Sequence, residues 1–226
     1  MNVRIVIPSA RASNLSACVG SIIAVDYGLP NPGYIIAVDD GARDGFTRPV
    51  TWVDGVKPFV FARNVNLGIA AAGDADVILM NDDAILMTEL GFSLWYDAMQ
   101  NRRDTVCSAA IVGTVCNQRQ VAQSTDTFRP EPKHLAFVCV YLPRPVIDRV
   151  GLLDERFTAY GYEDFDYCRR AREAGCQLAT WDGCVVDHSG HSTFRNNLDW
   201  PRLLMQGRQI YHEKWDSAGG FDPTVA

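Results

Sequence analysis

The sequence predicts a single α/β domain built on a mixed, mainly parallel sheet that helices flank. Short apolar strands alternate with amphipathic helices from residue 3 onward, which is the pattern of parallel sheets. These strands are apolar almost throughout, as expected when both faces of a sheet are covered. With 226 residues, the chain is long enough for one sizeable domain and short for two. We expect one domain over residues 1–194 and a helical appendage with a tail over residues 195–226.

The first half of the chain supplies most of the expected sheet. A strand over Val3–Ile7 ends at Pro8-Ser9, and Ser13 then caps a helix with one apolar face. The next strand, Tyr34–Val38, runs directly into Asp39-Asp40-Gly41. The elements expected after it are short strands over Val50–Val53 and Phe59–Phe61, a helix over Leu67–Ala75, a strand over Val77–Met80, a helix over Thr88–Gln100 and a strand over Val106–Val112.

The second half of the chain is less regular. Residues 117–133 are polar and are expected to form a long excursion of the kind that often borders a binding site. A strand over Leu135–Leu142 follows it. Apolar side chains at helical spacing then predict a helix from Phe165 that stops at Gly175. After Phe194 a last helix is expected to carry the aromatic residues Trp200, Tyr211 and Trp215.

Composition and charge narrow the class of protein. Hydrophobic residues make up 47% of the chain and charged residues 21%, as in an ordinary globular protein. The net charge of −6 argues against broad binding to nucleic acid or anionic lipid. We expect neither a membrane span nor a signal peptide, since the sequence has no apolar run of about 20 residues and does not open with a charged and then apolar stretch. The seven cysteines include no CxxC pair, so we expect a cytoplasmic protein whose thiols are mostly buried. A disulfide between Cys176 and Cys184 stays an open alternative.

Polar residues follow three of the expected strands at the points where these strands end. They are Pro8-Ser9, Asp39-Asp40 and Asn81-Asp82-Asp83. In parallel sheets, ligands bind beyond the carboxyl ends of the strands. Any one of these clusters is equally well explained as ordinary turn chemistry. Their joint occurrence predicts a binding site at this edge of the sheet.

The residue types at this edge suit a metal ion and a nucleotide. Asn81-Asp82-Asp83 offers hard oxygen ligands, and a divalent cation is often held by one or two carboxylates together with substrate phosphates. His188 adds an imidazole, which favours Mn²⁺ over Mg²⁺ if it binds directly. Asp40 can accept hydrogen bonds from a base or a ribose. The chain has no Walker or Rossmann phosphate loop, so the metal would have to neutralise a diphosphate.

Glu163 and Asp164 form a carboxylate pair at the start of the helix that contains Phe165. A helix N-terminus favours the ionised form of a nearby carboxylate, so Asp164 is a candidate general base. Taken alone, the pair is better explained as a complement to the helix dipole. The acidic clusters upstream give weight to the catalytic interpretation.

With these residues placed, the chain resembles a family 2 glycosyltransferase of the GT-A, Rossmann-like fold. The resemblance covers about residues 3–194, and its most specific segment is similar to rhamnosyltransferase-like bacterial and phage members. The motifs that carry it are IVIPSARASNLSACVGSI, VDDGARDG, NLGIAAAG, VILMNDDAIL, VGLLDERFTAYGYEDFDYCRRAREAG and DHSGHS. The resemblance implies a nucleotide-diphosphate sugar donor, with UDP- or dTDP-sugars favoured, and inversion at the anomeric carbon.

The resemblance also implies roles for individual residues. Asp164 matches the catalytic base that deprotonates the acceptor hydroxyl, and Asp83 and His188 match the metal site. Asp40 would contact the base of the donor. The further donor contacts expected are Pro8, Ser9, Asn81 and Asp82, and the expected supporting residues are Glu163 and His191.

The chain departs from the family pattern at Asn81, where the family's first metal-site carboxylate stands. Asp82 offers a substitute, so the ligand set within Asn81-Asp82-Asp83 stays open. A nucleotidyltransferase that forms a nucleotide sugar and a catalytically silent nucleotide-sugar-binding relative are the alternatives. The expected acceptor is a glycan, a protein or a lipid-linked intermediate, with DNA disfavoured. The C-terminal segment offers a surface for a homodimer.

Overall fold

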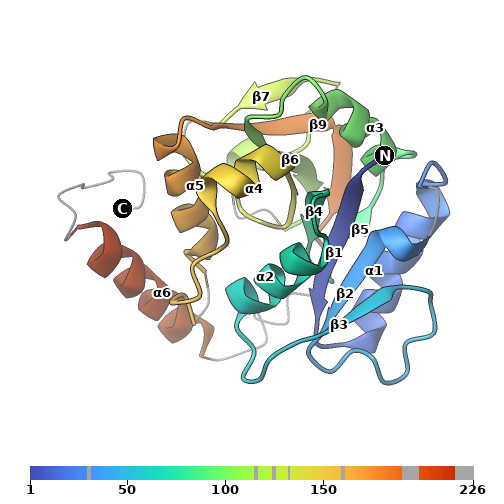
Figure 1. The fold of residues 1–226 in the computed structure, drawn as a ribbon, viewed down its shortest axis with the longest axis horizontal. Helices are drawn as coiled ribbons and strands as arrows, with labels where there is room; N and C mark the ends of the chain where they lie inside the picture. The colour runs from blue at the N-terminus through green and yellow to red at the C-terminus, as the bar shows by residue number, and fades with distance from the viewer. Residues whose placement is uncertain are drawn as a thin grey trace.

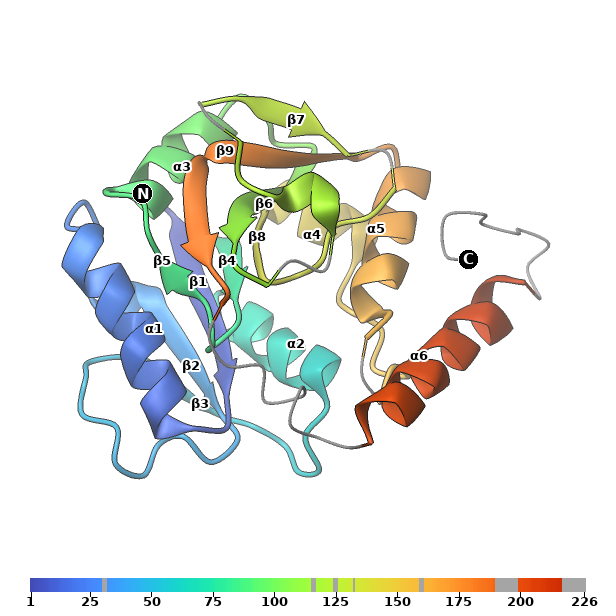
Figure 2. The same ribbon diagram turned by 180° about the vertical axis from the view of Figure 1, so that it is seen from behind.

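A computed structural model of the chain describes residues 1–29, 32–114, 117–123, 126–131, 133–158, 161–189 and 199–216. A central sheet lies between two layers of helices, and a last helix lies to one side (Figures 1 and 2). The predicted fold class, a single mixed α/β domain, is confirmed. Within the described residues, no helix is long and apolar enough to cross a membrane.

Nine strands form one sheet in the described part of the chain, in the order β3-β2-β1-β4-β8-β6-β9-β5, with β7 paired to β9. Strands β1 to β4 are mutually parallel, β6 and β9 are parallel, and the other pairings are antiparallel. The strands are β1 (Val3–Ser9), β2 (Ile35–Asp39), β3 (Thr51–Asp54), β4 (Asp76–Met80), β5 (Ile85–Leu86), β6 (Thr105–Val112), β7 (Phe128–Pro130), β8 (Cys139–Leu142) and β9 (Gln177–Asp187).

Two apolar cores lie on opposite faces of the sheet because strand side chains alternate between faces. Ile5 and Ile7 of β1 belong to the core beneath α1 and α3, and Val6 belongs to the core beneath α2, α4 and α5. The helices are α1 (Ala12–Val25), α2 (Phe61–Ala71), α3 (Gly91–Met99), α4 (Arg144–Val150), α5 (Glu163–Glu173) and α6 (Trp200–Trp215), with short 3-10 turns at Pro32–Tyr34 and Gln118–Gln120.

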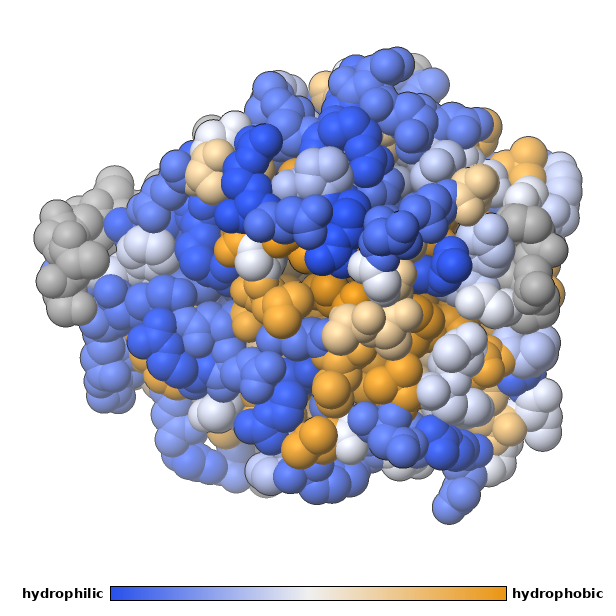
Figure 3. All heavy atoms as spheres, viewed as in Figure 1, coloured by the Kyte–Doolittle hydropathy of each residue, from blue (hydrophilic) through white to orange (hydrophobic). Residues whose placement is uncertain are grey.

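The surface reflects this layering. In the view of Figure 3, hydrophilic side chains cover most of the molecule, and apolar residues gather in the middle of the face. The six cysteines that the structure describes are all buried and free, so Cys176 and Cys184 form no disulfide. Burial raises the pKa of the Cys184 thiol, which keeps it protonated.

Several predicted elements differ from the structure. Ser13 does not cap the first helix, because α1 begins at Ala12 and its N-cap residue is Arg11. The predicted strand Phe59–Phe61 is wrong, because Phe61 begins α2 and the residues before it form a loop. Helix α2 therefore starts six residues before the predicted Leu67. The predicted strand Leu135–Leu142 is paired only from Cys139.

The predicted excursion over residues 117–133 is fastened to the sheet. Its β7 pairs with β9, and Arg129 forms a two-point ion pair with the buried Asp182 of β9 (2.7 and 2.8 Å). The Gln120 side chain is completely buried and bonds Ser108 Oγ (2.6 Å) and the backbone of Ala136. In its described part, the excursion is thus a packed cover over one end of the sheet.

The amino end of β4 carries a buried carboxylate that several elements share. Asp76 is 3% exposed and accepts hydrogen bonds from Tyr141 Oη (2.6 Å), Arg103 Nη2 (2.6 Å) and the backbone N–H of Arg144 (2.7 Å). A buried carboxylate requires such partners, since it has left water. Asp76 therefore ties β4 and β8 to α4 at the edge of the sheet that faces away from the predicted site.

Candidate active site

The three predicted clusters meet at the carboxyl edge of the parallel strands. Strands β1 and β2 pair in a register that places Ser9 beside Asp39, and the Asp40 N–H donates to Ser9 O (2.8 Å). Ser9 Oγ donates to Asp82 Oδ2 (2.7 Å), which joins the end of β1 to the residues that follow β4. Ser9 and the residues around Pro8 therefore border the same site as Asp82, as the sequence predicts.

Asp39 and Asp40 differ in what they contact. Asp39 Oδ1 accepts the backbone N–H groups of Gly41, Ala42 and Arg43 at 2.8–3.1 Å, so it shapes its own loop. Burial opposes ionisation of Asp39, but these hydrogen bonds and the Arg43 charge lower its pKa overall. Asp40 pairs instead with Lys57, whose Nζ lies 2.9 Å from Asp40 Oδ1. Asp40 is the more buried of the two carboxylates, with a side chain 6% exposed against 20% for Asp39, and Lys57 is its ionic partner.

Asp83 and His188 face each other although they are far apart in sequence. Asp83 Oδ1 lies 3.2 Å from His188 Nε2, and both side chains are about one-tenth exposed. On the other side of the ring, His188 Nδ1 lies 2.9 Å from the carbonyl oxygen of Thr114. A carbonyl only accepts hydrogen bonds, so Nδ1 carries the proton and Nε2 points toward Asp83. A metal-binding histidine is commonly oriented by this kind of bond.

The chain runs close to itself behind His188. The His188 N–H donates to Val112 O (3.0 Å), at the end of β6. Gly113 has a φ of +85°, and a Cβ at this position would lie 2.2 Å from Ser189 Oγ and 2.6 Å from the Ser189 backbone nitrogen. Only a glycine allows β6 and β9 to end in this way. Gly113 therefore sets where His188 stands.

The residues present fit a divalent cation held partly by its substrate. Asp83 and His188 would supply two ligands, and the described residues contain no group of three or more His, Cys, Asp or Glu side chains suited to a metal. Asn81 Oδ1 is buried and lacks a hydrogen-bond partner in the described part of the chain, so it is a further oxygen available beside them. A cation with few protein ligands and several substrate oxygens is the usual arrangement for metal–diphosphate binding.

Asp82 is a less suitable ligand than Asp83. Its Oδ2 is engaged by Ser9, and burial raises the pKa of its carboxyl, with the Asp83 charge adding to the effect. Ser9 and Asn14 oppose that shift by hydrogen bonding. The structure thus separates the neighbours: Asp82 bonds to β1, and Asp83 faces His188.

Glu163 and Asp164 form the first turn of α5, on a separate element. The residue before them, Tyr162, has a left-handed backbone (φ 74°), and Gly161 before it is also at positive φ (79°). Asp164 Oδ1 accepts the N–H of Phe165 (2.8 Å). Burial raises the pKa of Asp164 and, together with the Asp164 charge, that of Glu163. The expectation that the helix N-terminus keeps Asp164 readily ionised is corrected, because burial outweighs the backbone hydrogen bonds.

One segment lies between the two halves of the site. The carbonyl of Val138 accepts the N–H of Asn81 (2.9 Å), and the backbone of neighbouring Phe137 stabilises the Asp164 carboxylate by hydrogen bonding. Residues 137–138 therefore bring the Asn81–Asp83 turn and the Asp164 turn to the same region. Of the predicted site residues, His191 lies outside the described part of the chain.

Several residues of the site were not predicted. Lys57, Thr114 and the backbone of Val138 contact predicted residues across long stretches of chain, and no local pattern identifies such partners. Gly113 had a recognisable signal, because a glycine directly after an apolar strand marks a close backbone approach.

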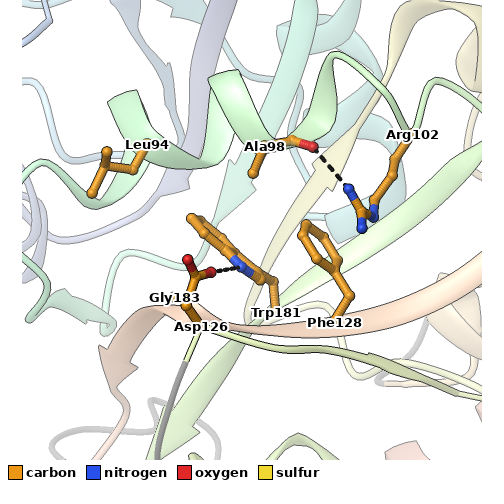
Figure 4. A pocket seen from close by; sticks show the side chains of 7 residues that line it. All are labelled: Leu94, Ala98, Arg102, Asp126, Phe128, Trp181 and Gly183. Atoms are coloured by element: carbon orange, nitrogen blue, oxygen red, sulfur yellow. Dashed lines mark hydrogen bonds between the residues drawn. The ribbon is translucent and has the colours of Figure 1, made fainter.

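A separate cavity of about 500 Å³ lies away from this edge, between α3 and the β7–β9 pair. Figure 4 shows its lining residues: Leu94, Ala98, Arg102, Asp126, Phe128, Trp181 and Gly183. Trp181 donates Nε1–H to Asp126 Oδ1 (2.6 Å), and Phe128 is stacked between Trp181 and the Arg102 guanidinium. Trp181 pairs with Ala109 of β6, whereas His188 follows the end of β9 and bonds to Val112, so the cavity lies back along the strands from His188. None of the lining residues belongs to the predicted site.

The fold is the GT-A fold, which this chain shares with solved structures of glycosyltransferases. No protein-family model matches the sequence, and no curated protein matches it.

Solved structures with the same fold are glycosyltransferases. The mannosyltransferase PcManGT from Pyrobaculum calidifontis, in complex with GDP-Man and Mn²⁺, matches with a TM-score of 0.68 and 15% identity over 99% of this chain and 66% of its own. GalNAc-T7 with UDP, GalNAc and Mn²⁺ matches with a TM-score of 0.66 and 13% identity over 93% of this chain. S. aureus TarS (residues 1–349) in complex with UDP-GlcNAc gives a TM-score of 0.63 and 11% identity over 94% of this chain.

These proteins are longer than the chain described here. The chain spans 49% of the GalNAc-T7 structure and 64% of another TarS 1–349 structure. At identities of 11–15% the likeness concerns the fold.

Proposed function

We propose that this protein is a metal-dependent, inverting glycosyltransferase that moves a sugar from a nucleotide-diphosphate sugar to an acceptor hydroxyl. The observation that carries the proposal is the meeting of Asp83 and His188 at 3.2 Å on the carboxyl edge of this fold. Structures with the same fold hold UDP with Mn²⁺ or GDP-Man with Mn²⁺. A family 2 relationship with rhamnosyltransferase-like members, and a UDP- or dTDP-sugar donor, are part of the proposal.

Each residue has a task in this proposal. Asp40, with Lys57 at 2.9 Å, binds the base of the donor. Ser9, Asn81 and Asp82 line the ribose and diphosphate. Asp83 and His188 hold the cation, with Mn²⁺ favoured over Mg²⁺ because an imidazole is among the ligands. When bound, the cation neutralises the diphosphate and stabilises the charge of the departing nucleotide.

Asp164 acts as the base. Its carboxylate accepts the proton of the acceptor hydroxyl while the hydroxyl oxygen attacks the anomeric carbon from the face opposite the nucleotide. The burial that raises the pKa of Asp164 also raises its basicity, so the proton transfer is more favourable than to an ordinary surface carboxylate. Glu163 is a supporting residue, since the raised pKa of its carboxyl favours the protonated form beside Asp164.

The test of the proposal is release of nucleotide from a panel of UDP-, dTDP- and GDP-sugars with Mn²⁺. Release that EDTA abolishes and Mn²⁺ restores supports it. Formation of pyrophosphate from a nucleoside triphosphate and a sugar phosphate would instead identify a nucleotidyltransferase. Tight donor binding without turnover would identify a binding protein.

Asp164→Asn is expected to lower the transfer rate by about 100- to 10,000-fold, the usual contribution of a general base. Donor affinity, measured by calorimetry, is expected to stay within a few-fold because Asp164 lies on α5, apart from the Asp83–His188 pair. Glu163→Gln, one residue away, is the matched control and is expected to lose far less activity. A parallel loss of donor affinity in Asp164→Asn would contradict the assignment of the base.

A further inference from the structure

The backbone before the catalytic turn is in an unusual conformation. Gly161 and Tyr162 are both at positive φ (79° and 74°), and for a bulky residue such as tyrosine this region is an outlier. Tyr162 is also the N-cap of α5 and makes no side-chain cap bond. The next two residues are Glu163 and Asp164. The direction in which Asp164 leaves the helix therefore depends on the conformation of Tyr162. Such strain persists only where the surroundings impose it.

Helix α6 supplies those surroundings. The Tyr162 ring stacks on Phe165 (centroids 5.1 Å apart) and lies 5.9 Å from the Tyr211 ring of α6. Phe165 also meets Tyr211 edge-on at 6.5 Å. Tyr211 is 2% exposed and forms a small core with Phe157. The left-handed residue is thus enclosed by rings from its own helix and from α6.

A charge cluster fixes α6 at this position. Lys214 Nζ lies 2.6 Å from Asp166 Oδ1 and 2.7 Å from Asp154 Oδ2. Trp215 Nε1 donates to the same Asp166 oxygen (3.0 Å), and the Arg169 guanidinium lies over the Trp215 ring at 4.1 Å. The Asp166 side chain is completely buried, so it needs these partners and Arg170 (2.9 Å). Figures 1 and 2 show α6 beside the end of α5 where α5 begins.

The N-terminal half of α6 also reaches the turn. A Cβ added to Gly161 would lie 3.0 Å from Leu204 Cδ1. The two residues before Glu163 therefore lie against α6, Gly161 beside Leu204 and the Tyr162 ring beside the Tyr211 ring.

We propose that α6 is a positioning element of the active site: Tyr211, held in place by Lys214, maintains the left-handed conformation of Tyr162 and so aims Asp164 at the acceptor hydroxyl. The inference rests on the proposed function for the role of Asp164. It gives the C-terminal helix a part in catalysis without a contact to the reacting atoms.

The test uses two variants that release α6 and two controls. Tyr211→Ala removes the enclosing ring, and Lys214→Met removes the ammonium that joins Asp154 and Asp166. Tyr211→Phe keeps the ring, and Gln206→Ala changes an exposed residue of the same helix. Circular dichroism checks that all four fold.

The first measurement is hydrogen exchange of the amides of residues 161–166. Exchange is expected to be at least tenfold faster in Tyr211→Ala and Lys214→Met than in the wild type, and unchanged in both controls. Unchanged exchange in the two releasing variants would overturn the inference. This measurement needs no turnover, so it decides the positioning even if no donor is cleaved.

The second measurement is the pH dependence of transfer. In Tyr211→Ala and Lys214→Met, kcat is expected to fall at least tenfold and the midpoint of the ascending limb to shift, with donor KM within threefold. Faster exchange with unchanged kcat and midpoint would mean that α6 only covers apolar surface, and would overturn the inference. A wild-type protein that releases nucleotide from no donor overturns the proposed function instead.

Discussion

Asp164 and Glu163 are consecutive carboxylates whose environments oppose ionisation. Burial raises the pKa of both, and the Asp164 charge further raises that of Glu163. Two like charges on one helical turn are most stable when one of them holds a proton. The arrangement favours a neutral Glu163 beside an ionised Asp164, which suits the proposal that Asp164 is the base and Glu163 its supporting neighbour.

This environment predicts the pH dependence of transfer. The base must be ionised to accept a proton, so the rate is expected to rise with pH through the pKa of Asp164. Because burial raises that pKa, the midpoint is expected above the ordinary carboxyl value of about 4. A profile of kcat/KM against pH measures it. A midpoint at or below the ordinary value would contradict a buried base.

The stability of the protein should respond in the opposite sense. A carboxyl whose folded pKa is raised binds its proton more tightly in the folded state, so folding loses stability as pH rises from the unfolded toward the folded pKa. At neutral pH, Asp164→Asn removes this penalty and is expected to unfold at the same or a higher temperature than the wild type. Lost activity in this variant would then not result from unfolding.

The neighbouring aspartates of the metal site are expected to behave differently. Asp83→Ala removes the partner of His188 and is expected to weaken Mn²⁺ binding in the presence of UDP at least tenfold, measured by calorimetry. Asp82→Ala is the matched control, since Asp82 bonds to Ser9, and its effect on Mn²⁺ should be smaller. If Asp82→Ala lost Mn²⁺ and Asp83→Ala did not, the ligand role would move to Asp82.

At the scale of elements, the ends of β6 and β9 place His188. Val112 O, Thr114 O and Gly113 all lie behind the histidine, so the two strand ends act together as its support. The candidate site is thus built from the ends of two groups of strands: β1, β2 and β4 bring Ser9, Asp40 and Asp83, and β6 and β9 bring His188.

Gly113→Ala tests this support. The added methyl group would meet Ser189 at 2.2–2.7 Å, so residues 188–189 must shift, and Mn²⁺-dependent activity is expected to fall at least tenfold. Gly175→Ala is the control, because Gly175 is also at positive φ (77°) but has nothing within 4 Å of a Cβ. Both variants carry backbone strain of about 1–2 kcal/mol. Equal activity in the two variants would show that the position of Ser189 is unimportant.

At the scale of the whole molecule, the fold and much of the site could be predicted from local patterns. Uniformly apolar strands such as Val77–Met80 identify a sheet buried on both faces. The carboxyl-edge rule then brings Ser9, Asp40 and Asp83 together without any knowledge of their distances. The approach of Asp83 to His188, however, appears only in the three-dimensional structure.

The errors have physical causes. Phe59-Val60-Phe61 has the aromatic and β-branched composition of a strand, whereas α2 begins there with the polar Asn64 and Asn66 buried on its face. Distant groups bond Asn66, whose Nδ2 donates to Leu153 O (2.9 Å) and Glu155 Oε1 (3.0 Å), whereas Asn64 Oδ1 accepts the N–H of Val56 (3.3 Å). Lys57, Thr114 and Lys214 were missed for the same reason, since each is defined by a partner far along the chain.

The network at Asp76 predicts where stability is concentrated. Asp76→Ala leaves Tyr141 and Arg103 without their buried acceptor and is expected to cost about 3 kcal/mol in the free energy of unfolding. Asp148→Ala breaks an exposed i,i+4 pair with Arg144 and should cost less than about 1 kcal/mol. Urea denaturation measures both. A loss of equal size in the two variants would contradict the role given to Asp76.

The position of Asp76 at the amino ends of the strands has a consequence for how such a protein can change. The network that holds β4, β8 and α4 together shares no residue with Ser9, Asp40, Asp83 or His188 at the opposite ends. Substitutions among the candidate site residues therefore leave the hydrogen bonds of Asp76 in place. The amino ends of the strands carry a stabilising network, and the carboxyl ends carry the candidate site. Side chains at the carboxyl ends can therefore change specificity while the network at the amino ends keeps the molecule folded.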